Sequence, residues 1–194
     1  MKQQNQDLYF VTSNDYKFSE VSKIFQEENL KFHLKQCKLK TTEIQAKSTR
    51  DVAIYKLNSV REKINGSFFI EDAGFFVDQP LNGFPGVYSS YVFKTIGNEG
   101  ILKLITNFEK TKAHFSALIA LYFKPKDEIL IFEGIVNGMV SNEIRGTQGF
   151  GFDPIFIPYE IPDKTFGELT IKEKNKISHR GRALVQLISF LKKV

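Results

Sequence analysis

Cysteine, histidine and tryptophan are scarce in this sequence of 194 residues, which contains one, three and none of them, respectively. The single cysteine, Cys37, cannot form an internal disulfide, so we expect a reducing compartment. So few cysteines and histidines also argue against a zinc site. If a metal is bound, its ligands should be oxygen atoms, which favour Mg²⁺, with Mn²⁺ as a possible substitute.

Long apolar runs are missing as well. The longest, ALIALYF at 117–123, is far too short to span a bilayer. The N-terminus, MKQQNQDLYF, has no apolar core of the kind found in signal peptides. We therefore expect a cytoplasmic protein without a membrane partner. The length, and the lack of linkers, repeats and low-complexity segments, predict one domain over residues 1–194.

Several familiar catalytic motifs are absent, which narrows the choice of chemistry. The sequence contains no phosphate loop of the form G-x-x-x-x-G-K-[ST] and no G-x-G-x-x-G after a strand. It also lacks H-E-x-x-H, C-x-x-C and G-x-S-x-G. The 27 Lys and Arg residues outnumber the 22 Asp and Glu residues, which gives a net charge of +5. This mild excess suits an anionic ligand, but an ordinary basic surface would explain it equally well.

Strand-like and helix-like segments alternate along the chain. Short apolar runs predict strands, and apolar residues spaced by three and four predict helices. A hairpin is expected around 125–127, and an amphipathic helix should begin after the N-cap Ser178. The pattern favours a mixed α/β or α+β sheet over a purely parallel one. The expected strands are 8–12, 32–36, 68–70, 75–77, 113–123, 129–137 and 155–157; further helices should follow Ser13 or Asn14, follow Thr49 or Asp51, and span 98–108.

The first candidate site is FVTSNDYK at 10–17, where a strand ends and a helix begins. Backbone N–H groups at a helix N-terminus bind anions well, and Lys17 would add a positive charge. Ordinary helix capping by Ser13 or Asn14 explains the same residues. On spacing alone, phosphate binding and capping both remain open.

The second candidate is FFIEDAGFFVD at 68–78, where two carboxylates lie between apolar runs. Burying an unpaired charge is costly, so Glu71 and Asp72 need partners. Successive strand residues point to opposite faces, so we expect only one of the two to face a cleft. Gly74 would let the backbone bend or a ligand approach. The alternative is that both carboxylates mark the solvated end of a strand.

The third candidate is RGTQGFGFDPIF at 145–156, a glycine-rich loop before a short strand. Such a loop can approach a planar ring, with Phe as a stacking face and Asp as a hydrogen-bond acceptor. A long mobile loop with one Phe in the core is the alternative.

The fourth candidate is KEKNKISHRGRAL at 172–184, a basic cluster around the expected helix start. Cations at a helix N-terminus oppose the helix dipole, so a bound anion would explain them. A solvated basic face is the alternative.

A nucleoside polyphosphate would use all four stretches, and their order along the chain resembles a known family. The chain is similar to the inosine triphosphate pyrophosphatase family, also called Ham1-like, and to its archaeal members most of all. The resemblance covers Phe10 to Leu191. It is carried by FVTSNDYKFSEV at 10–21, EIQ at 43–45, IEDAGFFVDQPLNGFPGVYS at 70–89, GTQGFGFDPIF at 146–156 and EKNKISHRGRAL at 173–184.

The resemblance implies an α/β fold with a long mixed, twisted sheet flanked by helices and with two lobes around a central cleft, usually in a homodimer. It also implies Mg²⁺-dependent hydrolysis of ITP, dITP and XTP to the monophosphate and pyrophosphate. Asp72 matches the family's proton acceptor, and Glu43 and Asp72 match its metal ligands. The positions that match substrate contacts are Thr12, Ser13, Asn14, Asp15, Tyr16 and Lys17 for the triphosphate, Phe150, Gly151, Phe152 and Asp153 for the base, and Lys56, Ala73, Lys174, His179 and Arg180.

Three residues depart from the family pattern. Ala73 replaces a usual Ser or Thr and removes a hydroxyl, and Phe152 replaces a common Tyr or Trp, which keeps stacking but loses a polar group. Ser13 stands where Gly is frequent. Two alternatives stay open. Ala73 and Phe152 are consistent with a pyrophosphatase of broader or different base preference, and the basic charge balance suggests a non-catalytic protein that binds nucleotides or nucleic acid. Binding to nucleic acid is not expected under the main interpretation.

Overall fold

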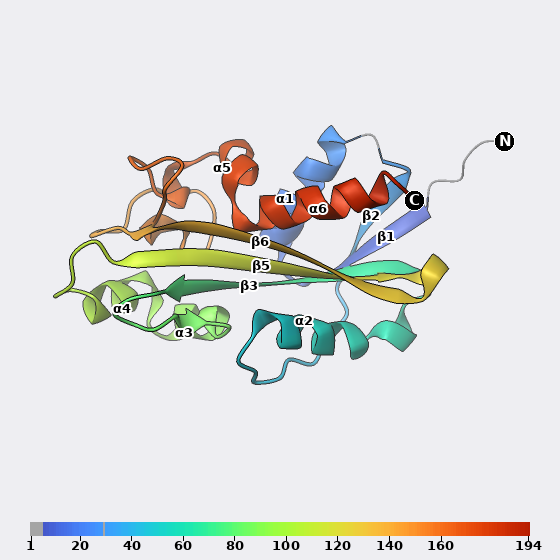
Figure 1. The fold of residues 1–194 in the computed structure, drawn as a ribbon, viewed down its shortest axis with the longest axis horizontal. Coiled ribbons are helices and arrows are strands. Elements are labelled where there is room, and N and C mark those ends of the chain that lie inside the picture. The colour runs from blue at the N-terminus through green and yellow to red at the C-terminus, as the bar shows by residue number, and fades with distance from the viewer. Residues whose placement is uncertain (1–5, 29) are drawn as a thin grey trace. The chain divides into compact units, whose positions relative to one another are not determined.

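The fold is an α/β arrangement around one mixed sheet (Figure 1). The computed structural model describes residues 6–28 and 30–194. Its strands are β1 (Gln6–Val11), β2 (Phe32–Cys37), β3 (Ser67–Val77), β4 (Phe84–Gly86), β5 (Lys112–Phe123), β6 (Glu128–Val140) and β7 (Phe156–Pro158). Its helices are α1 (Asp15–Glu27), α2 (Thr49–Asn58), α3 (Ser89–Thr95), α4 (Gly97–Leu104), α5 (Ile171–Ile177) and α6 (His179–Leu191), with 3₁₀ turns at Arg61–Lys63, Lys124–Lys126, Asp153–Ile155 and Phe166–Glu168.

The sheet has the strand order β2-β1-β3-β5-β6-β7, with β4 paired to β3. Strand β1 runs parallel to both of its neighbours, and Leu8 pairs with Leu34 of β2 and with Ser67 of β3. The pairs β3–β4 and β6–β7 are antiparallel. Strands β5 and β6 are neighbours joined by a short connection, as the expected hairpin requires. The predicted mixed α/β sheet is therefore confirmed.

The chain divides into two compact units, which we describe one at a time. Unit 1 comprises Met1–Asp72, Ala117–Gly134 and Gly181–Val194, and unit 2 comprises Ala73–Ser116 and Ile135–Arg180. Strands β3, β5 and β6 contribute residues to both units. The single domain and the cleft expected from the sequence stay predictions.

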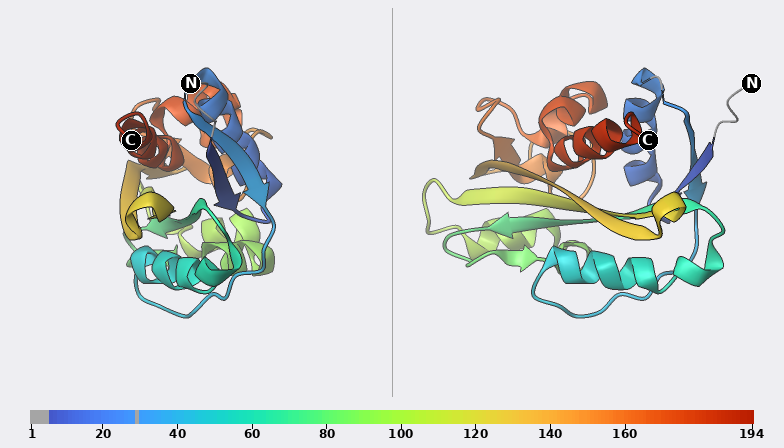
Figure 2. Two further views of the ribbon diagram at one scale, coloured as in Figure 1. Left: turned by 90° about the vertical axis from the view of Figure 1, so that its right-hand side faces the viewer. Right: turned by 45° about the vertical axis from the view of Figure 1, so that its right-hand side comes forward.

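Unit 1 has a sheet covered on both faces. On one face, Phe10 and Phe69 stack with ring centroids 4.6 Å apart, in a cluster that includes residues of α1 and α6. On the other face, Phe68 and Ile70 pack with α2. The helices α1 and α6 lie on one side of these strands and α2 lies on the other (Figures 1 and 2). Neighbouring residues of β3 thus serve different layers, as the two-residue period of a strand requires.

Unit 2 has its own core, which is rich in phenylalanine. Phe75 of β3 contacts the rings of Phe115, Phe152 and Phe156 at centroid distances of 4.9, 5.0 and 6.1 Å. Val92 of α3 and the α4 residues nearby complete the same cluster. In both units the core is built mainly from Phe, Ile, Leu and Val.

The structure differs from the sequence expectations in four elements, the first of which is the unexpected strand β4. Residues 68–70 and 75–77 belong to one unbroken strand, β3, because Glu71 and Asp72 find partners on opposite faces and need not interrupt it. Helices α3 and α5 were not expected. The signal for α5 was present, because Thr170 and Glu173 form a capping box.

No helix within residues 6–28 and 30–194 is both long and apolar enough to cross a membrane.

Candidate functional site

The turn between β1 and α1, in unit 1, is built by capping hydrogen bonds. Asn14 is the N-cap, and its Oδ1 accepts from the backbone N–H of Lys17 at 3.1 Å. Thr12 Oγ1 accepts from the backbone N–H of Asn14 at 3.1 Å. Ser13, Asp15 and Tyr16 are exposed. The capping interpretation is confirmed, and phosphate binding at this helix start stays a prediction.

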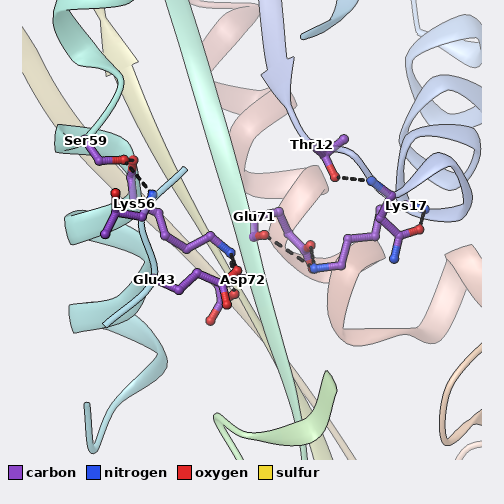
Figure 3. Close-up of polar contacts among 9 residues, drawn as sticks. Thr12, Lys17, Glu43, Lys56, Ser59, Glu71 and Asp72 are labelled. Atoms are coloured by element: carbon purple, nitrogen blue, oxygen red, sulfur yellow. Dashed lines mark hydrogen bonds and ion pairs between the residues drawn. The ribbon is translucent and has the colours of Figure 1, made fainter. Parts of the chain in front are cut away.

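The Lys17 side chain leaves this turn and reaches β3. Its Nζ lies 2.6 Å from Glu71 Oε2 and 3.4 Å from the Glu71 carbonyl oxygen (Figure 3). The Glu71 side chain has no exposed surface, and that of Lys17 is mostly buried. Lys17 was expected to contact the triphosphate, and this ion pair was not expected from the sequence. A phosphate contact by Lys17 would therefore have to share its ammonium with Glu71.

Asp72 lies on the opposite face of β3 and meets a different lysine. Lys56 Nζ, from the last turn of α2, is 3.1 Å from Asp72 Oδ1 and 2.7 Å from Glu43 Oε1 (Figure 3). Glu43 lies between β2 and α2, in a segment outside the helices and strands. Its side chain is 67% exposed, whereas those of Asp72 and Lys56 are 13% and 11% exposed. The structure thus brings together Glu43, Lys56 and Asp72, three of the residues predicted from the sequence.

Ser59 bonds to the backbone on both sides of this cluster, a role that was not predicted from the sequence. Its Oγ donates to the Lys56 carbonyl oxygen at 2.7 Å and accepts from the backbone N–H of Thr42 at 3.2 Å. The hydroxyl therefore ties the end of α2 to the segment that carries Glu43. No pattern in the sequence marks a serine for this role.

The electrostatics of the cluster follow from burial and charge. Burial raises the pKa of Asp72, and the charge of Glu71 adds to this effect, while Lys56 and Lys17 oppose it. Burial alone would lower the pKa of Lys56, but the nearby carboxylates of Asp72 and Glu43 outweigh it and raise the pKa. Lys56 is therefore an ammonium at neutral pH.

Glu43 and Asp72 also fit the expected metal. Within the described part of the chain, no group of three or more His, Cys, Asp and Glu side chains is placed to hold an ion. Mg²⁺ is commonly bound through one or two carboxylates, with water and substrate phosphates as the other ligands. Two carboxylates that converge on one cation, here the Lys56 ammonium, match that smaller set.

In unit 2, Asp153 and Lys174 form a buried ion pair at the glycine-rich loop. Lys174 Nζ lies 2.7 Å from Asp153 Oδ2, and the two side chains are 2% and 3% exposed, respectively. The same oxygen accepts from the backbone N–H of Phe150 at 2.7 Å. Asp153 was expected to accept a hydrogen bond from the base. In this structure its carboxylate shapes the loop, and the expected contact with the base stays a prediction.

The two aromatic residues of the loop have different environments. Phe152 is 3% exposed and stacks on Phe75 in the core of unit 2. Its ring packs in the core, and the base contact expected of Phe152 stays a prediction. Phe150 is half-buried, with Lys174 Nζ 5.0 Å and the Arg180 guanidinium 5.5 Å from its ring centroid. Gly151 is fixed by Asn98 Nδ2, which donates to its carbonyl oxygen at 3.2 Å.

The remaining expected contacts in unit 2 are His179, Arg180 and Ala73. His179 stacks on Phe115 with a centroid distance of 4.7 Å, and it is 3% exposed. Arg180 is 1% exposed. Ala73 follows Asp72 in β3 and is half-buried. Their predicted roles toward substrate stay predictions.

Comparison with known proteins places the chain in a family. The Ham1 family model matches residues 8–190, and the chain belongs to this family. It is similar to the dITP/XTP pyrophosphatases of Thermococcus kodakarensis (49% identity, 95% of this chain and 97% of the relative) and Pyrococcus horikoshii (45%, 95% and 96%). The resemblance inferred from the sequence motifs is thereby confirmed.

Solved structures agree with this placement. The Ham1 protein of Staphylococcus aureus has a TM-score of 0.81 at 28% identity, covering 97% of this chain and 99% of that one. A HAM1 protein from Coxiella burnetii has the same TM-score at 27% identity, covering 97% and 100%. The seven-stranded mixed sheet is therefore that of the Ham1 proteins.

Gly149 provides a test of the loop in unit 2. Its φ is +74°, and a Cβ added there would collide with the Asp153 carboxylate. Gly149→Ala should therefore cost about 1–3 kcal/mol of stability beyond backbone strain, because it disturbs a buried hydrogen-bonded carboxylate. Urea unfolding measures this loss.

The matched control is Gly97→Ala, at φ +61° with no atom within 4 Å of the added Cβ. It should show backbone strain alone, about 1–2 kcal/mol. Equal losses for the two variants would contradict the role given to Asp153.

Proposed function

We propose that this chain is a metal-dependent nucleoside triphosphate pyrophosphatase acting on the non-standard purine nucleotides ITP, dITP and XTP. Its products would be the nucleoside monophosphate and pyrophosphate, so the enzyme would clear these nucleotides from the pool. The observation that carries the proposal is the convergence of Glu43 and Asp72 on one cation in a Ham1 fold. The names of the relatives, dITP/XTP pyrophosphatase, support the same substrates.

The reaction is attack by water on the α-phosphorus. The water oxygen forms a bond to phosphorus, the bond to the bridging oxygen of the β-phosphate breaks, and pyrophosphate leaves with that electron pair. A divalent cation bound by Glu43 and Asp72, Mg²⁺ in our proposal, would neutralise phosphate charge and acidify water. Asp72 accepts the proton of the attacking water on Oδ2, since Oδ1 faces Lys56. Its raised pKa makes it a stronger base than an ordinary aspartate.

Charge neutralisation and positioning do the rest, because phosphoryl chemistry needs little covalent help from the protein. We assign Lys56 and the turn from Thr12 to Lys17 to the phosphates, and Lys174 and Arg180 supply further cations. The family motif carries these assignments. Lys174 and Arg180 are buried. They would therefore contact the phosphates only at short range, or after the residues around them rearrange locally.

Base selection is assigned to unit 2. A 6-oxo purine presents an acceptor where adenine presents a donor. We assign the ring contact to Phe150 and hydrogen-bond donation to backbone groups of 150–153 and to His179 and Arg180. Adenine would leave a donor unpaired, at a cost of about 1–3 kcal/mol per group.

The decisive experiment compares ITP, XTP, dITP, GTP and ATP with Mg²⁺ and identifies the products. Monophosphate and pyrophosphate from the first three, at kcat/KM values at least about tenfold above ATP, are expected from the unpaired-donor cost. Diphosphate as product would mean attack at the γ-phosphorus and a different enzyme. Comparable values for ITP and ATP would favour the alternative of broad base preference. Salt-sensitive binding of nucleic acid without turnover would favour the binding protein.

Asp72→Asn tests the proposed proton acceptor. The variant keeps the shape of the side chain but removes the base and one metal ligand, so turnover should fall by roughly 10²–10⁴-fold. Single-turnover pyrophosphate release measures the loss, and thermal unfolding checks the fold.

Asp7→Asn is the control for Asp72→Asn, because it removes the same charge from an exposed Asp7–Lys35 ion pair. Its rate should match the wild-type rate. An Asp72→Asn enzyme with wild-type turnover would remove Asp72 from the mechanism.

We also propose a homodimer, as the family resemblance implies. In unit 2, Tyr88 and Tyr91 expose 45% and 71% of their surfaces around the start of α3, and Phe84 and Phe93 are also exposed. Neighbouring exposed aromatic side chains are typical of protein interfaces. A second copy of the chain is the partner we assign to them.

Tyr91→Glu tests the homodimer. A charge in an apolar interface is left without a partner, so the dimer dissociation constant should rise at least about tenfold. Light scattering after size exclusion measures the mass over a concentration series. Tyr159→Glu, at a tyrosine of unit 2 that is 50% exposed, is the control and should leave the dimer intact. A monomeric wild-type protein, or an unaffected Tyr91→Glu dimer, would contradict the assignment.

A further inference from the structure

We propose that Lys56 is the resident cation of the metal site, and that it makes metal binding depend on nucleotide binding. In this inference, the ammonium holds Glu43 and Asp72 together before substrate arrives, and the nucleotide phosphates then draw it away. The inference rests on the proposed function, and it gives Lys56 a role in addition to contacting substrate.

The geometry carries the first step. Lys56 Nζ lies within hydrogen-bond distance of one oxygen from each proposed metal ligand, at 2.7 Å from Glu43 and 3.1 Å from Asp72. A divalent cation that used the same two oxygens would take the space between them. An ammonium and a metal ion cannot both fill that space, because they would meet at contact distance with like charge. The two therefore compete for one position.

The backbone positions of the three residues in this cluster are held by hydrogen bonds and by the sheet. Ser59 Oγ fixes the Lys56 carbonyl and the backbone of Thr42, next to Glu43, and Asp72 is held in the middle of the sheet by β3. The freedom left in the cluster belongs to the long Lys56 side chain and to the exposed Glu43 side chain. The side chains can thus exchange partners while the backbone stays in place.

The charges carry the second step. Two carboxylates and one ammonium leave the cluster a single negative charge, which is a weak attraction for a free divalent ion. Nucleotide phosphates offer the ammonium a new anionic partner, and its departure restores two negative charges for the metal. Metal and nucleotide binding should therefore be positively coupled, and such couplings are typically about 5- to 150-fold in affinity.

Lys56→Met is the main test, and it predicts a gain rather than a loss. Without nucleotide, the variant should bind Mn²⁺ at least about fivefold more tightly than the wild type, because the competing cation is gone. Free and bound Mn²⁺ are measured by electron paramagnetic resonance. With the non-hydrolysable α,β-methylene analogue of ITP, wild-type Mn²⁺ affinity should rise at least fivefold after correction for Mn²⁺ bound to the analogue. The variant should show a smaller rise.

Three further variants sharpen the test. Lys56→Arg keeps the cation and should bind free Mn²⁺ as weakly as the wild type. Lys35→Met removes a lysine from an exposed pair with Asp7 and should leave Mn²⁺ affinity unchanged. Lys56→Gln gives the same comparison through a polar side chain if Lys56→Met does not fold, and thermal unfolding decides which variant is used.

Unchanged or weaker Mn²⁺ binding in the folded neutral variant would overturn the inference. So would a wild-type Mn²⁺ affinity that is indifferent to the nucleotide analogue. These measurements need no turnover, so they are independent of the substrate panel. If the wild-type protein releases no pyrophosphate and the neutral variant still gains Mn²⁺ affinity, the proposed function fails and the competition stands.

Discussion

The two-residue period of β3 is the constraint on which the arrangement of unit 1 depends. Phe68, Ile70 and Asp72 face the layer of α2, whereas Phe69 and Glu71 face the layer of α1 and α6. Each face has apolar residues followed by one carboxylate, and each carboxylate meets a lysine from the helix that covers it (Figure 3). A shift of one residue would exchange these partners and bury both charges against the wrong helix.

This division gives the two carboxylates different chemistry. Glu71 is completely buried with a lysine from the first turn of α1, so its ion pair joins the helix start to the sheet. Removing either partner of such a pair leaves a buried charge, which is strongly destabilising. Asp72 keeps some exposure and shares its lysine with an exposed glutamate. Only the second arrangement can exchange a cation without disrupting the core, which is why we place the chemistry there.

Periodicity and capping rules allowed much of this to be predicted from the sequence. Alternation separated Glu71 from Asp72, and the N-cap Asn14 was one of two residues proposed for that position. Contacts between distant segments could not be predicted: Lys17 and Glu71 are 54 residues apart, and no local pattern pairs them. The sequence alone does not show which of Phe150 and Phe152 is buried. Packing against Phe75 decides which of them is buried, and that contact exists only in the folded chain.

Two of the lysine–aspartate pairs, Lys174–Asp153 in unit 2 and Lys56–Asp72 in unit 1, show why we expect a rigid loop in one unit and an exchangeable cation in the other. In unit 2, the side chains of Lys174 and Asp153 are buried, and the Lys174 ammonium lies over the ring of Phe150. Asp153 also accepts a hydrogen bond from the backbone N–H of Phe150. Opening that pair would separate two buried opposite charges, which is destabilising, so the pair holds the shape of the loop. In unit 1, the Lys56 ammonium already has two acceptors, and one of them is open to solvent. Water or a phosphate can replace a contact there as it breaks, so we expect exchange to cost less than it would in the buried pair of unit 2. A rigid loop suits the recognition of a planar base that we propose for unit 2, and an exchangeable cation suits the metal binding that we propose to depend on the nucleotide.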